Sequence, residues 1–505
     1  MTAEARKEAI DQVLVLLDKE GVEVEFKAAS DSLPKSIWET ISAFANTAGG
    51  TLFLGVSETK RTFNVDGVQD AEKLESDFWN TFRNKNKISP FSIGTDAFEI
   101  IDAGNGKKII RITIPQVDYS EIPVYLNGDI RQTYIRRGEG DFLVNEEELK
   151  TLLRNNSQKS QDRVPLKSLS IDDLDRRALA SFKSLIEARY PGNYEEMKMQ
   201  DFLLHVGLLD DSDKENICPY SGTLLLFGKY NVIKRYFNSY QMDYFDYRDS
   251  SERWSDRVAT DDLGPDEMNI FNFYNIVYQK LASVSKAGFR MGKDMVRVNT
   301  DMKEALREAL INTIVHADYA IPNGSVRIEV YDTYYRFENP GKMLIPVEKF
   351  FRGVTTKSRN DVIMSVFRRL GLSERQGYGG YQIFRAASNN MLRTPIIETS
   401  IDKTVLTIWL VDLPGSYPDL DTVEKSILSC ILHEGVLSKG ELENMLPSGY
   451  SEYRIKKALR SLTDKGILSM TGSGRSVKYT INISATEKLG QTRLLLERLS
   501  EVFKK

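Results

Sequence analysis

Two polar, turn-rich segments interrupt this chain, and they constrain its fold more than any other feature. Residues 155–168 read NNSQKSQDRVPLKS, and residues 413–420 read LPGSYPDL. Both are rich in residues that favour loops, and neither has the apolar periodicity of a helix or a strand. At 505 residues the chain also exceeds what a single hydrophobic core usually holds. We therefore expect an α/β multidomain protein.

The patterns on either side of these segments predict five units. Helical and strand patterns alternate up to residue 412, and three short helices with a β-hairpin follow. We expect an N-terminal α+β domain (1–154), a connecting α/β domain (165–300), a second α/β domain (301–412), a three-helix and hairpin domain (420–483) and a C-terminal helix (484–505).

Cysteine content and hydropathy indicate the cytoplasm. The two cysteines, Cys218 and Cys430, cannot form a disulfide framework or a zinc cluster by themselves. No apolar run approaches the roughly 18–20 residues of a membrane span, and the N-terminal stretch lacks the pattern of a secretory signal. We expect a cytoplasmic protein without a membrane partner.

Three glutamates near two predicted strands are candidate metal ligands and catalytic groups. Glu20 and Glu25 flank the entry to the strand VEVEFKAA, and Glu58 follows GGTLFLGV. If the two strands are neighbours, the carboxylates converge at one end of a sheet. There they can hold Mg²⁺ or Mn²⁺ for phosphodiester hydrolysis, with Lys27 neutralising a phosphate. The alternative is that these acids are merely solvated.

These glutamates belong to a longer pattern that resembles the Schlafen-type AlbA-like domain. The pattern runs from Glu20 and VEFK through SAFANTAGG and LGV to YIRRG at 134–138. The resemblance implies an α+β, nucleic-acid-binding domain over about residues 15–150. Some members of that family cleave RNA with two Glu and one Asp at the positions that match Glu20, Glu25 and Glu58.

One departure from the family pattern leaves cleavage and binding alone as open alternatives. The chain has Ser57-Glu58 where the family usually has two Asp residues. The extra methylene of Glu shifts the carboxylate by about 1 Å, which matters in a preorganised site. In the same domain, we expect Gly49 and Gly50 to permit a tight turn and Asn46 to cap the preceding helix.

The predicted helix over 301–318 carries a second candidate site. Glu308, Asn312 and His316 follow one another at intervals of four residues and therefore share one helical face. A glutamate can act as a general base toward water, and an Asn oxygen can ligate Mg²⁺ on phosphates. His316 either contacts phosphate or is a satisfied helix histidine.

A glycine-rich loop downstream offers a phosphate-binding element. The chain has no P-loop motif, so a helicase-type motor is not expected. The string GYGG instead enters a predicted helix, where backbone N–H groups can approach phosphates beside the helix N-terminus. The predicted phosphate contacts are Gly377, Gly379 and Gly380.

In this order the strings resemble the GHKL-type ATPase domain, in the divergent form of bacterial helicase-related ATP-binding proteins that are often catalogued as transcriptional regulators. The matching strings are REALIN, HADY, ENPG and GYGG, within a resemblance over most of 165–412. It implies an α/β sandwich that binds ATP and Mg²⁺, with Glu308 as the water-activating base and Asn312 as the Mg²⁺ ligand. His316, Asn339 and Gly341 would contact the nucleotide. Asn339 replaces the usual adenine-contacting Asp, so adenine preference is less secure.

The C-terminal unit has a basic surface on an otherwise acidic chain. The net charge is −4, yet residues 421–505 hold 14 Lys and Arg against 10 Asp and Glu. Three helices and a hairpin are the layout of a winged helix, whose third helix enters the major groove. The predicted nucleic-acid contacts are Arg454, Lys457, Arg460, Arg475 and Lys478. Protein docking is the alternative.

These features predict an ATP-binding and nucleic-acid-binding protein that forms a homodimer or larger oligomer. Two functions stay open. The first is an ATP-regulated, metal-dependent (ribo)nuclease of an antiviral defence or stress system, with GHKL-type ATPase activity. The second is an ATP-responsive winged-helix transcriptional regulator without nuclease activity.

Overall fold

The structure is a computed structural model, and the chain divides into two compact units. One comprises residues 1–156 and 417–483, and the other comprises residues 157–416 and 484–505. The structure describes residues 24–59, 62–103, 106–138, 140–156, 160–248, 253–262, 267–286, 300–347, 350, 357–373, 379–447, 449–471, 477–482 and 487. Within these residues, no helix is long and apolar enough to cross a membrane.

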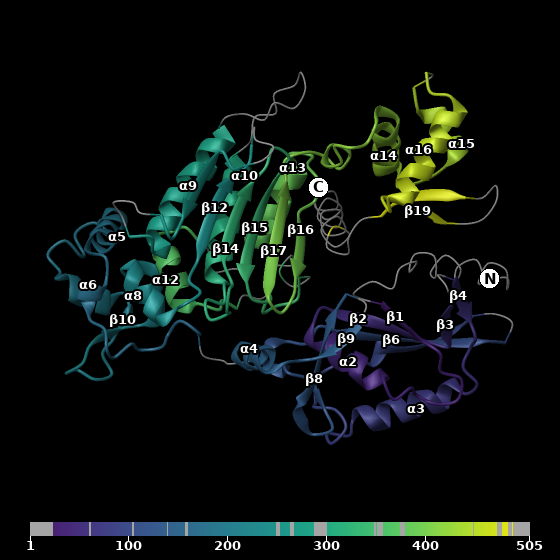
Figure 1. The fold of residues 1–505 in the computed structure, drawn as a ribbon, viewed down its shortest axis with the longest axis horizontal. Coiled ribbons are helices and arrows are strands. Elements are labelled where there is room, and N and C mark those ends of the chain that lie inside the picture. The colour runs from purple at the N-terminus through teal and green to yellow at the C-terminus, as the bar shows by residue number, and fades with distance from the viewer. Residues whose placement is uncertain are drawn as a thin grey trace, which may run out of the picture. The chain divides into compact units, whose positions relative to one another are not determined.

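The N-terminal module is built on a four-stranded sheet in the order β1-β2-β6-β5 (Figure 1). Strands β1 and β2 are parallel, and the other pairs are antiparallel. The strands are β1 (Val24–Lys27), β2 (Gly49–Leu54), β5 (Phe98–Asp102) and β6 (Lys108–Pro115). The helices are α2 (Ile37–Asn46), α3 (Ala71–Phe82) and α4 (Glu146–Asn156), and the smaller sheets combine β3 (Val56–Thr59) with β4 (Thr62–Val65), and β7 (Tyr125–Leu126) with β8 (Asp129–Arg137) and β9 (Gly140–Leu143).

The AFANTAGG string joins α2 to β2 through close packing. Gly49 has a φ of +82°, and a Cβ atom there would lie 2.7 Å from the backbone nitrogen of Gln116. The sequence suggested that Asn46 caps α2, but the C-cap position is Thr47. Instead the Asn46 amide donates to the carbonyl of Val124 at 2.8 Å and to that of Tyr134 at 3.0 Å. The buried Asn46 therefore joins α2 to β8 and to Val124, the residue before β7.

The second unit contains a six-stranded sheet in the order β13-β12-β14-β15-β17-β16. Its strands are β12 (Met242–Asp246), β13 (Asp256–Ala259), β14 (Val326–Val330), β15 (Tyr334–Pro340), β16 (Ile396–Thr399) and β17 (Lys403–Trp409). Strands from the predicted domains 165–300 and 301–412 thus share one sheet. One hydrophobic core also runs through both, from Leu169 to Leu410.

Helices of this unit pack along the sheet, with α10 on β14 and β15 and α13 on β17 (Figure 1). Val326, Ile328 and Val330 of β14 are buried on the face that α10 covers, and on the other face Arg327 is half-buried and Glu329 is buried. The main helices are α9 (Ile270–Lys286), α10 (Thr300–Val315), α12 (Asp361–Arg369) and α13 (Gly379–Asn389). The region before them holds α5 (Arg176–Arg189), α6 (Met199–His205), α7 (Ser221–Phe227), α8 (Tyr230–Tyr236) and the pair β10 (Leu209–Asp210) and β11 (Cys218–Pro219).

The C-terminal module has the predicted order of elements and one further strand. Its elements are α14 (Thr422–Glu434), β18 (Val436–Ser438), α15 (Lys439–Met445), α16 (Glu452–Asp464), β19 (Leu468–Thr471) and β20 (Lys478–Ile481). Strand β20 lies between β18 and β19 in an antiparallel sheet. Asp421, Ser438 and Ser451 cap the three helices. The predicted helix over 484–505 lies outside the described residues, apart from Glu487.

Candidate functional site

An open cavity lies beside α10 in the second unit. Its wall combines apolar side chains with a smaller number of amide, hydroxyl and cationic groups. No Asp or Glu is present among the described residues that line it, which are Ala309, Asn312, Thr313, His316, Phe337, Asn339, Lys342, Met343, Leu344, Ile345, Phe350, Lys357, Ile397, Thr404 and Leu406. A cavity of this composition is suited to a ligand with an apolar part and an anionic part.

The polar face of α10 lies as its four-residue spacing predicts. Asn312 and His316 line the cavity, and Nδ2 of Asn312 donates to Oε1 of Glu308 at 3.2 Å. Glu308 is only 8% exposed. Burial, followed by the nearby guanidinium of Arg359, lowers the pKa of His316 to about 4. His316 is therefore neutral at physiological pH and contributes no positive charge to the cavity.

Asn339 reaches the same cavity from the end of β15. It pairs with Thr404 across β15 and β17, and both residues line the cavity. Nδ2 of Asn339 donates to the carbonyl of Pro340 at 3.2 Å, and the Thr404 hydroxyl donates to the carbonyl of Gly341 at 2.9 Å. In this amide orientation, Oδ1 of Asn339 is the atom that can accept a hydrogen bond from a ligand.

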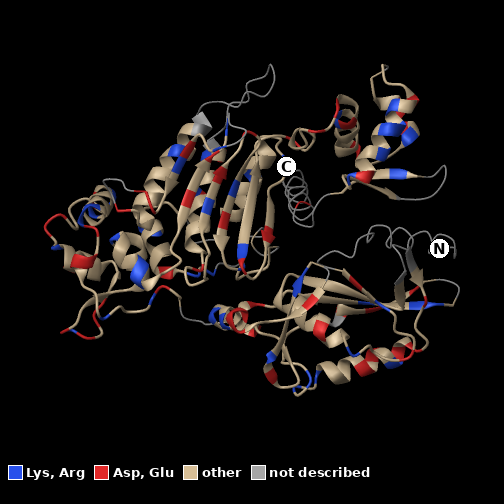
Figure 2. Cartoon of the chain, viewed as in Figure 1, with Lys and Arg blue, Asp and Glu red and all other residues tan. Residues whose placement is uncertain are grey.

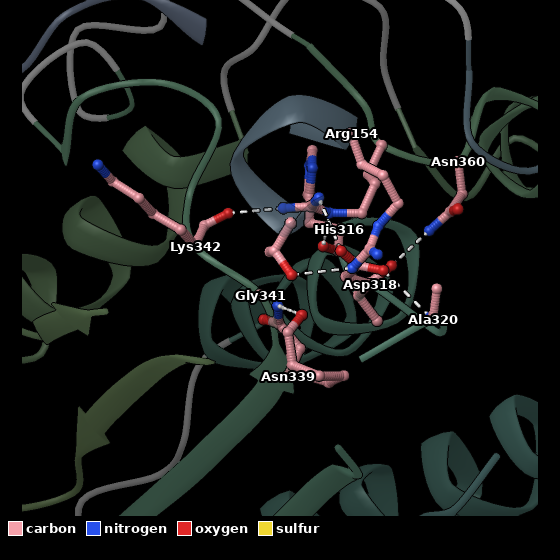
Figure 3. Close-up of polar contacts among 12 residues, drawn as sticks. Arg154, His316, Asp318, Ala320, Asn339, Gly341, Lys342 and Asn360 are labelled. Carbon is pink, nitrogen blue, oxygen red and sulfur yellow. Dashed lines mark hydrogen bonds and ion pairs between the residues drawn. The ribbon is translucent and has the colours of Figure 1, made fainter. Parts of the chain in front are cut away.

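A buried cluster of Arg359, Asp318 and Asn360 holds the cavity wall together (Figure 3). Arg359 donates to the carbonyl oxygens of His316 at 3.0 Å and Lys342 at 2.8 Å, and its Nη1 lies 3.5 Å from Oδ2 of Asp318. Asn360 donates to the carbonyls of Val315 and Ala317. This Arg359 cluster therefore joins the end of α10 to the segment after β15 and to the start of α12.

Gly341 packs against the Arg359 cluster rather than lining the cavity. Its φ is +95°, and a Cβ atom there would lie 3.0 Å from Cβ of Asp318 and 3.1 Å from Nη2 of Arg359. A side chain at this position would be strained by the backbone and crowded by both neighbours. The structure thus gives the glycine of ENPG a packing role, and its predicted contact with nucleotide stays a prediction.

The glycines of GYGG bring the N-terminus of α13 close to α10. A Cβ atom at Gly379 would overlap Oε1 of Glu308, and one at Gly380 would lie 2.6 Å from the ring of Phe350. Gly377 lies outside the described residues. The N-terminus of α13, which carries the partial positive charge of a helix N-terminus, therefore lies beside Glu308. The structure accordingly connects Gly379 with Glu308, while phosphate contacts from this loop remain a prediction.

Two lysines complete the cavity, and the sequence did not reveal them as site residues. Burial lowers the pKa of Lys342, which is 3% exposed, to about 7. Burial, and to a smaller extent Arg359, also lowers the pKa of Lys357. Lys342 directly follows ENPG, and Lys357 lies two residues before Arg359. The position of Lys342 directly after ENPG is a sequence signal that could have indicated it, whereas Lys357 adjoins none of the matching strings.

In the N-terminal module, Glu25 is engaged in ion pairs. Its Oε1 lies 3.0 Å from Nζ of Lys27, and its Oε2 lies 2.9 Å from Nη2 of Arg136. Arg136 is almost fully buried and also binds Asp141 at 2.9 Å, and Asp141 in turn accepts a hydrogen bond from Thr40 at 2.5 Å. Glu25 and Lys27 point to the same face of β1, because Phe26 between them is buried.

The side chains of the other two predicted metal ligands, Glu20 and Glu58, lie outside the part of the chain that the structure describes. Glu20 lies outside the described residues, and of Glu58 only the backbone is described. The two strands are neighbours as expected, but Glu25 pairs with Leu52, six residues before Glu58. Among the described side chains, no three His, Cys, Asp or Glu residues form a group that could hold a metal ion. The metal-site hypothesis therefore stays a prediction.

Helix α16 presents its basic residues to solvent. Arg454, Lys457 and Arg460 are exposed, while Ile455, Leu459 and Leu462 on the opposite side are buried. Figure 2 shows the Lys and Arg positions of this helix in blue. Arg454 lies over the ring of Tyr450 at 5.6 Å, and Arg460 lies 3.7 Å from Asp464. Lys478 is exposed at the start of β20, and Arg475 lies outside the described residues.

Three family models match separate parts of the chain. Residues 20–145 match the model described as Schlafen, AlbA_2. Residues 323–408 match the model described as "Putative ATP-dependent DNA helicase recG C-terminal". Residues 150–243 match a domain of unknown function. The second match includes Asn339, Lys342 and Gly379 but begins after α10. The chain therefore contains a Schlafen AlbA_2 domain and a domain similar to the C-terminal part of a putative ATP-dependent DNA helicase.

Comparisons of the whole chain add little to this result. No curated protein matches it. A solved structure, the DIP2311 protein from Corynebacterium diphtheriae, is similar over 95% of this chain and 100% of its own, with 16% identity and a TM-score of 0.38. At that TM-score the similarity does not define the fold. The domain matches thus indicate a nucleic-acid-related, ATP-binding function.

Proposed function

We propose that residues 157–416 form a GHKL-type module that binds ATP with Mg²⁺, and that this module serves a nucleic-acid-binding protein. The cavity beside α10 carries the proposal. Its apolar wall suits a base, and its amide and lysine side chains suit ribose and phosphates. The match of residues 323–408 to a helicase-related, ATP-dependent domain supports the same ligand.

Glu308 and Asn312 have the chemistry for a hydrated Mg²⁺ and a nucleophilic water. Nδ2 of Asn312 is bonded to Glu308, so its Oδ1 is the atom left to ligate a cation. Bound Mg²⁺ would neutralise charge on the phosphates. Glu308, held beside Asn312 and the N-terminus of α13, is placed to accept a proton from water. Hydrolysis of ATP would follow from these two roles.

The flanking modules are proposed to bind nucleic acid. The match to the Schlafen AlbA_2 model supports this role for the N-terminal module. The arrangement of α14, α15, α16 and a three-stranded sheet supports a winged helix, with α16 as the helix that enters the major groove. The exposed Arg454, Lys457 and Arg460 would contact phosphates there.

Nuclease activity at the N-terminal module is the second candidate, and the ion pairs of Glu25 favour binding without cleavage. A carboxylate that neutralises Lys27 and the buried Arg136 must leave those partners before it can ligate a cation. Removing one partner from such a buried pair is costly. We therefore propose an ATP-responsive nucleic-acid-binding protein as the lead function, with the winged helix as the duplex-binding part.

One experiment separates the two functions. Labelled tRNA, single-stranded RNA and duplex DNA would be incubated with the protein and Mg²⁺ or Mn²⁺, with and without ATP. The wild type would be compared with the Glu20→Ala/Glu25→Ala double variant and with Asp77→Ala, an exposed acid of α3, as the matched control. Binding without cutting supports the lead function. Cutting that the double variant alone abolishes establishes the nuclease instead.

A further inference from the structure

Two lysines from separate elements converge on the cavity wall. Lys342 follows β15, and Lys357 precedes α12, yet both line the cavity with Asn312. No carboxylate lies among the described residues of that lining. Two lysine side chains in a wall without a lining acid suit an anion, because a nearby negative charge favours the protonated form of each lysine.

The structure holds Lys342 in place through its backbone. Arg359 donates to the carbonyl oxygen of Lys342 at 2.8 Å, and Met343 donates its N–H to the Thr399 hydroxyl at 3.0 Å. In Figure 3 the side chain of Lys342 runs away from Asp318 and the Arg359 cluster. Asp318 pairs with Arg359. The side chain of Lys342 extends away from Asp318.

We propose that Lys342 and Lys357 form the phosphate-binding pair of the cavity, so that the ligand is a nucleoside di- or triphosphate rather than a nucleoside. This inference rests on the proposed function and names the part of the ligand that each side chain binds. Glu308 and Asn312 would then act at the far end of the phosphates. The apolar residues Phe337, Ile397 and Leu406 would enclose the base.

The burial of Lys342 fits this role. A lysine that is 3% exposed loses most of its hydration, and burial lowers its pKa accordingly. A multiply charged anion restores the electrostatic stabilisation that hydration would have given. A bound anion would therefore favour the charged form of Lys342. A lysine that only packed in the core would gain nothing from such a ligand.

The test measures the affinities of the full-length protein for ATP, ADP, adenosine and inorganic tripolyphosphate by calorimetry. Lys342→Met and Lys357→Met are compared with Lys403→Met, a half-exposed lysine of β17 that binds Glu338 at 3.2 Å. We expect each cavity variant to weaken ATP and tripolyphosphate binding at least tenfold and to change adenosine binding less than twofold. Lys403→Met should leave all four affinities unchanged.

The remaining outcomes decide between this inference and the function on which it rests. ATP affinity that survives in both cavity variants overturns the lysine pair and leaves the nucleotide site intact. Equal losses of ATP and adenosine binding also overturn the pair, because they indicate a distorted cavity. If the wild type binds tripolyphosphate but not ATP, and the variants lose that binding, the pair stands and the nucleotide proposal fails. Binding of neither ligand by the wild type overturns both.

Discussion

The guanidinium of Arg393 binds the carboxylate of Glu487, 94 residues further along the chain. Nε and Oε1 are 2.8 Å apart, and Nη2 and Oε2 are 3.4 Å apart. The two side chains are 10% and 2% exposed, and the guanidinium also lies over the ring of Trp409 at 4.5 Å. Residues 417–483 belong to the other unit, so this pair joins Glu487 back to the unit of residues 157–416.

Arg393→Ala should therefore lower the free energy of unfolding of this unit by about 3 kcal/mol, since it leaves a buried carboxylate without its partner. Urea denaturation of the variant and the wild type gives the value. The double variant Arg393→Met/Glu487→Leu should recover most of the loss, because no buried charge remains. A single variant within about 0.5 kcal/mol of the wild type would show that Glu487 finds other partners.

Glu308→Gln should separate binding from hydrolysis. The substitution keeps the shape beside Gly379 and removes the base, so we expect kcat for ATP hydrolysis to fall about 10²–10⁴-fold. The affinity for ATP should change less than threefold. The matched control is Glu304→Gln, an exposed glutamate one turn earlier on α10, which should leave both quantities unchanged. If Glu304→Gln lowers kcat as much as Glu308→Gln does, the loss is not specific to Glu308, and its role as the base is contradicted.

The pKa of Lys342 differs between the folded and unfolded states, which predicts that the free energy of unfolding depends on pH. Burial lowers its pKa from 10.5 to about 7 in the folded chain. Between these values the unfolded state binds the extra proton, so this group makes stability rise with pH, by up to about 1.4 kcal/mol per pH unit. Below pH 7 both states are protonated and the contribution is constant.

Urea denaturation at pH 7, 8 and 9 checks this for the wild type and Lys342→Met. The difference between wild-type and variant stability should increase with pH across that range. Lys357 is present in both proteins and cancels in the comparison. Identical pH slopes would mean that the ammonium of Lys342 titrates near its ordinary value in the folded chain.

Local features of this chain follow from its sequence, whereas the assembly of the cavity does not. The spacing of Glu308, Asn312 and His316 predicts their shared face, because a helix fixes which residues lie together. Lys342 and Lys357 are separated by fifteen positions and converge only because Arg359 joins three elements. That contact depends on tertiary packing, and no local pattern encodes it.

The same reasoning explains Asn46 and Glu25. A polar residue shortly before Gly-Gly is typical of a helix cap, but the Asn46 side chain instead bonds Val124, before β7, and Tyr134 in β8. The metal-ligand role predicted for the carboxylate in VEFK stays a prediction, and the structure adds a partner that the sequence did not indicate, Arg136, 111 residues away. Partners that arrive from distant strands decide what such side chains do, and a single sequence does not show them.

Replacing Arg454, Lys457 and Arg460 of α16 by Ala should weaken duplex binding with little effect on stability, because all three are exposed. If each contacts one phosphate, the slope of log affinity against log salt should fall by about 3. Fluorescence anisotropy of a labelled duplex at several salt concentrations measures this slope. Lys425→Ala on α14 is the control and should leave it unchanged. An unaltered slope in the triple variant would place the duplex on another surface and leave α16 with a protein-docking role.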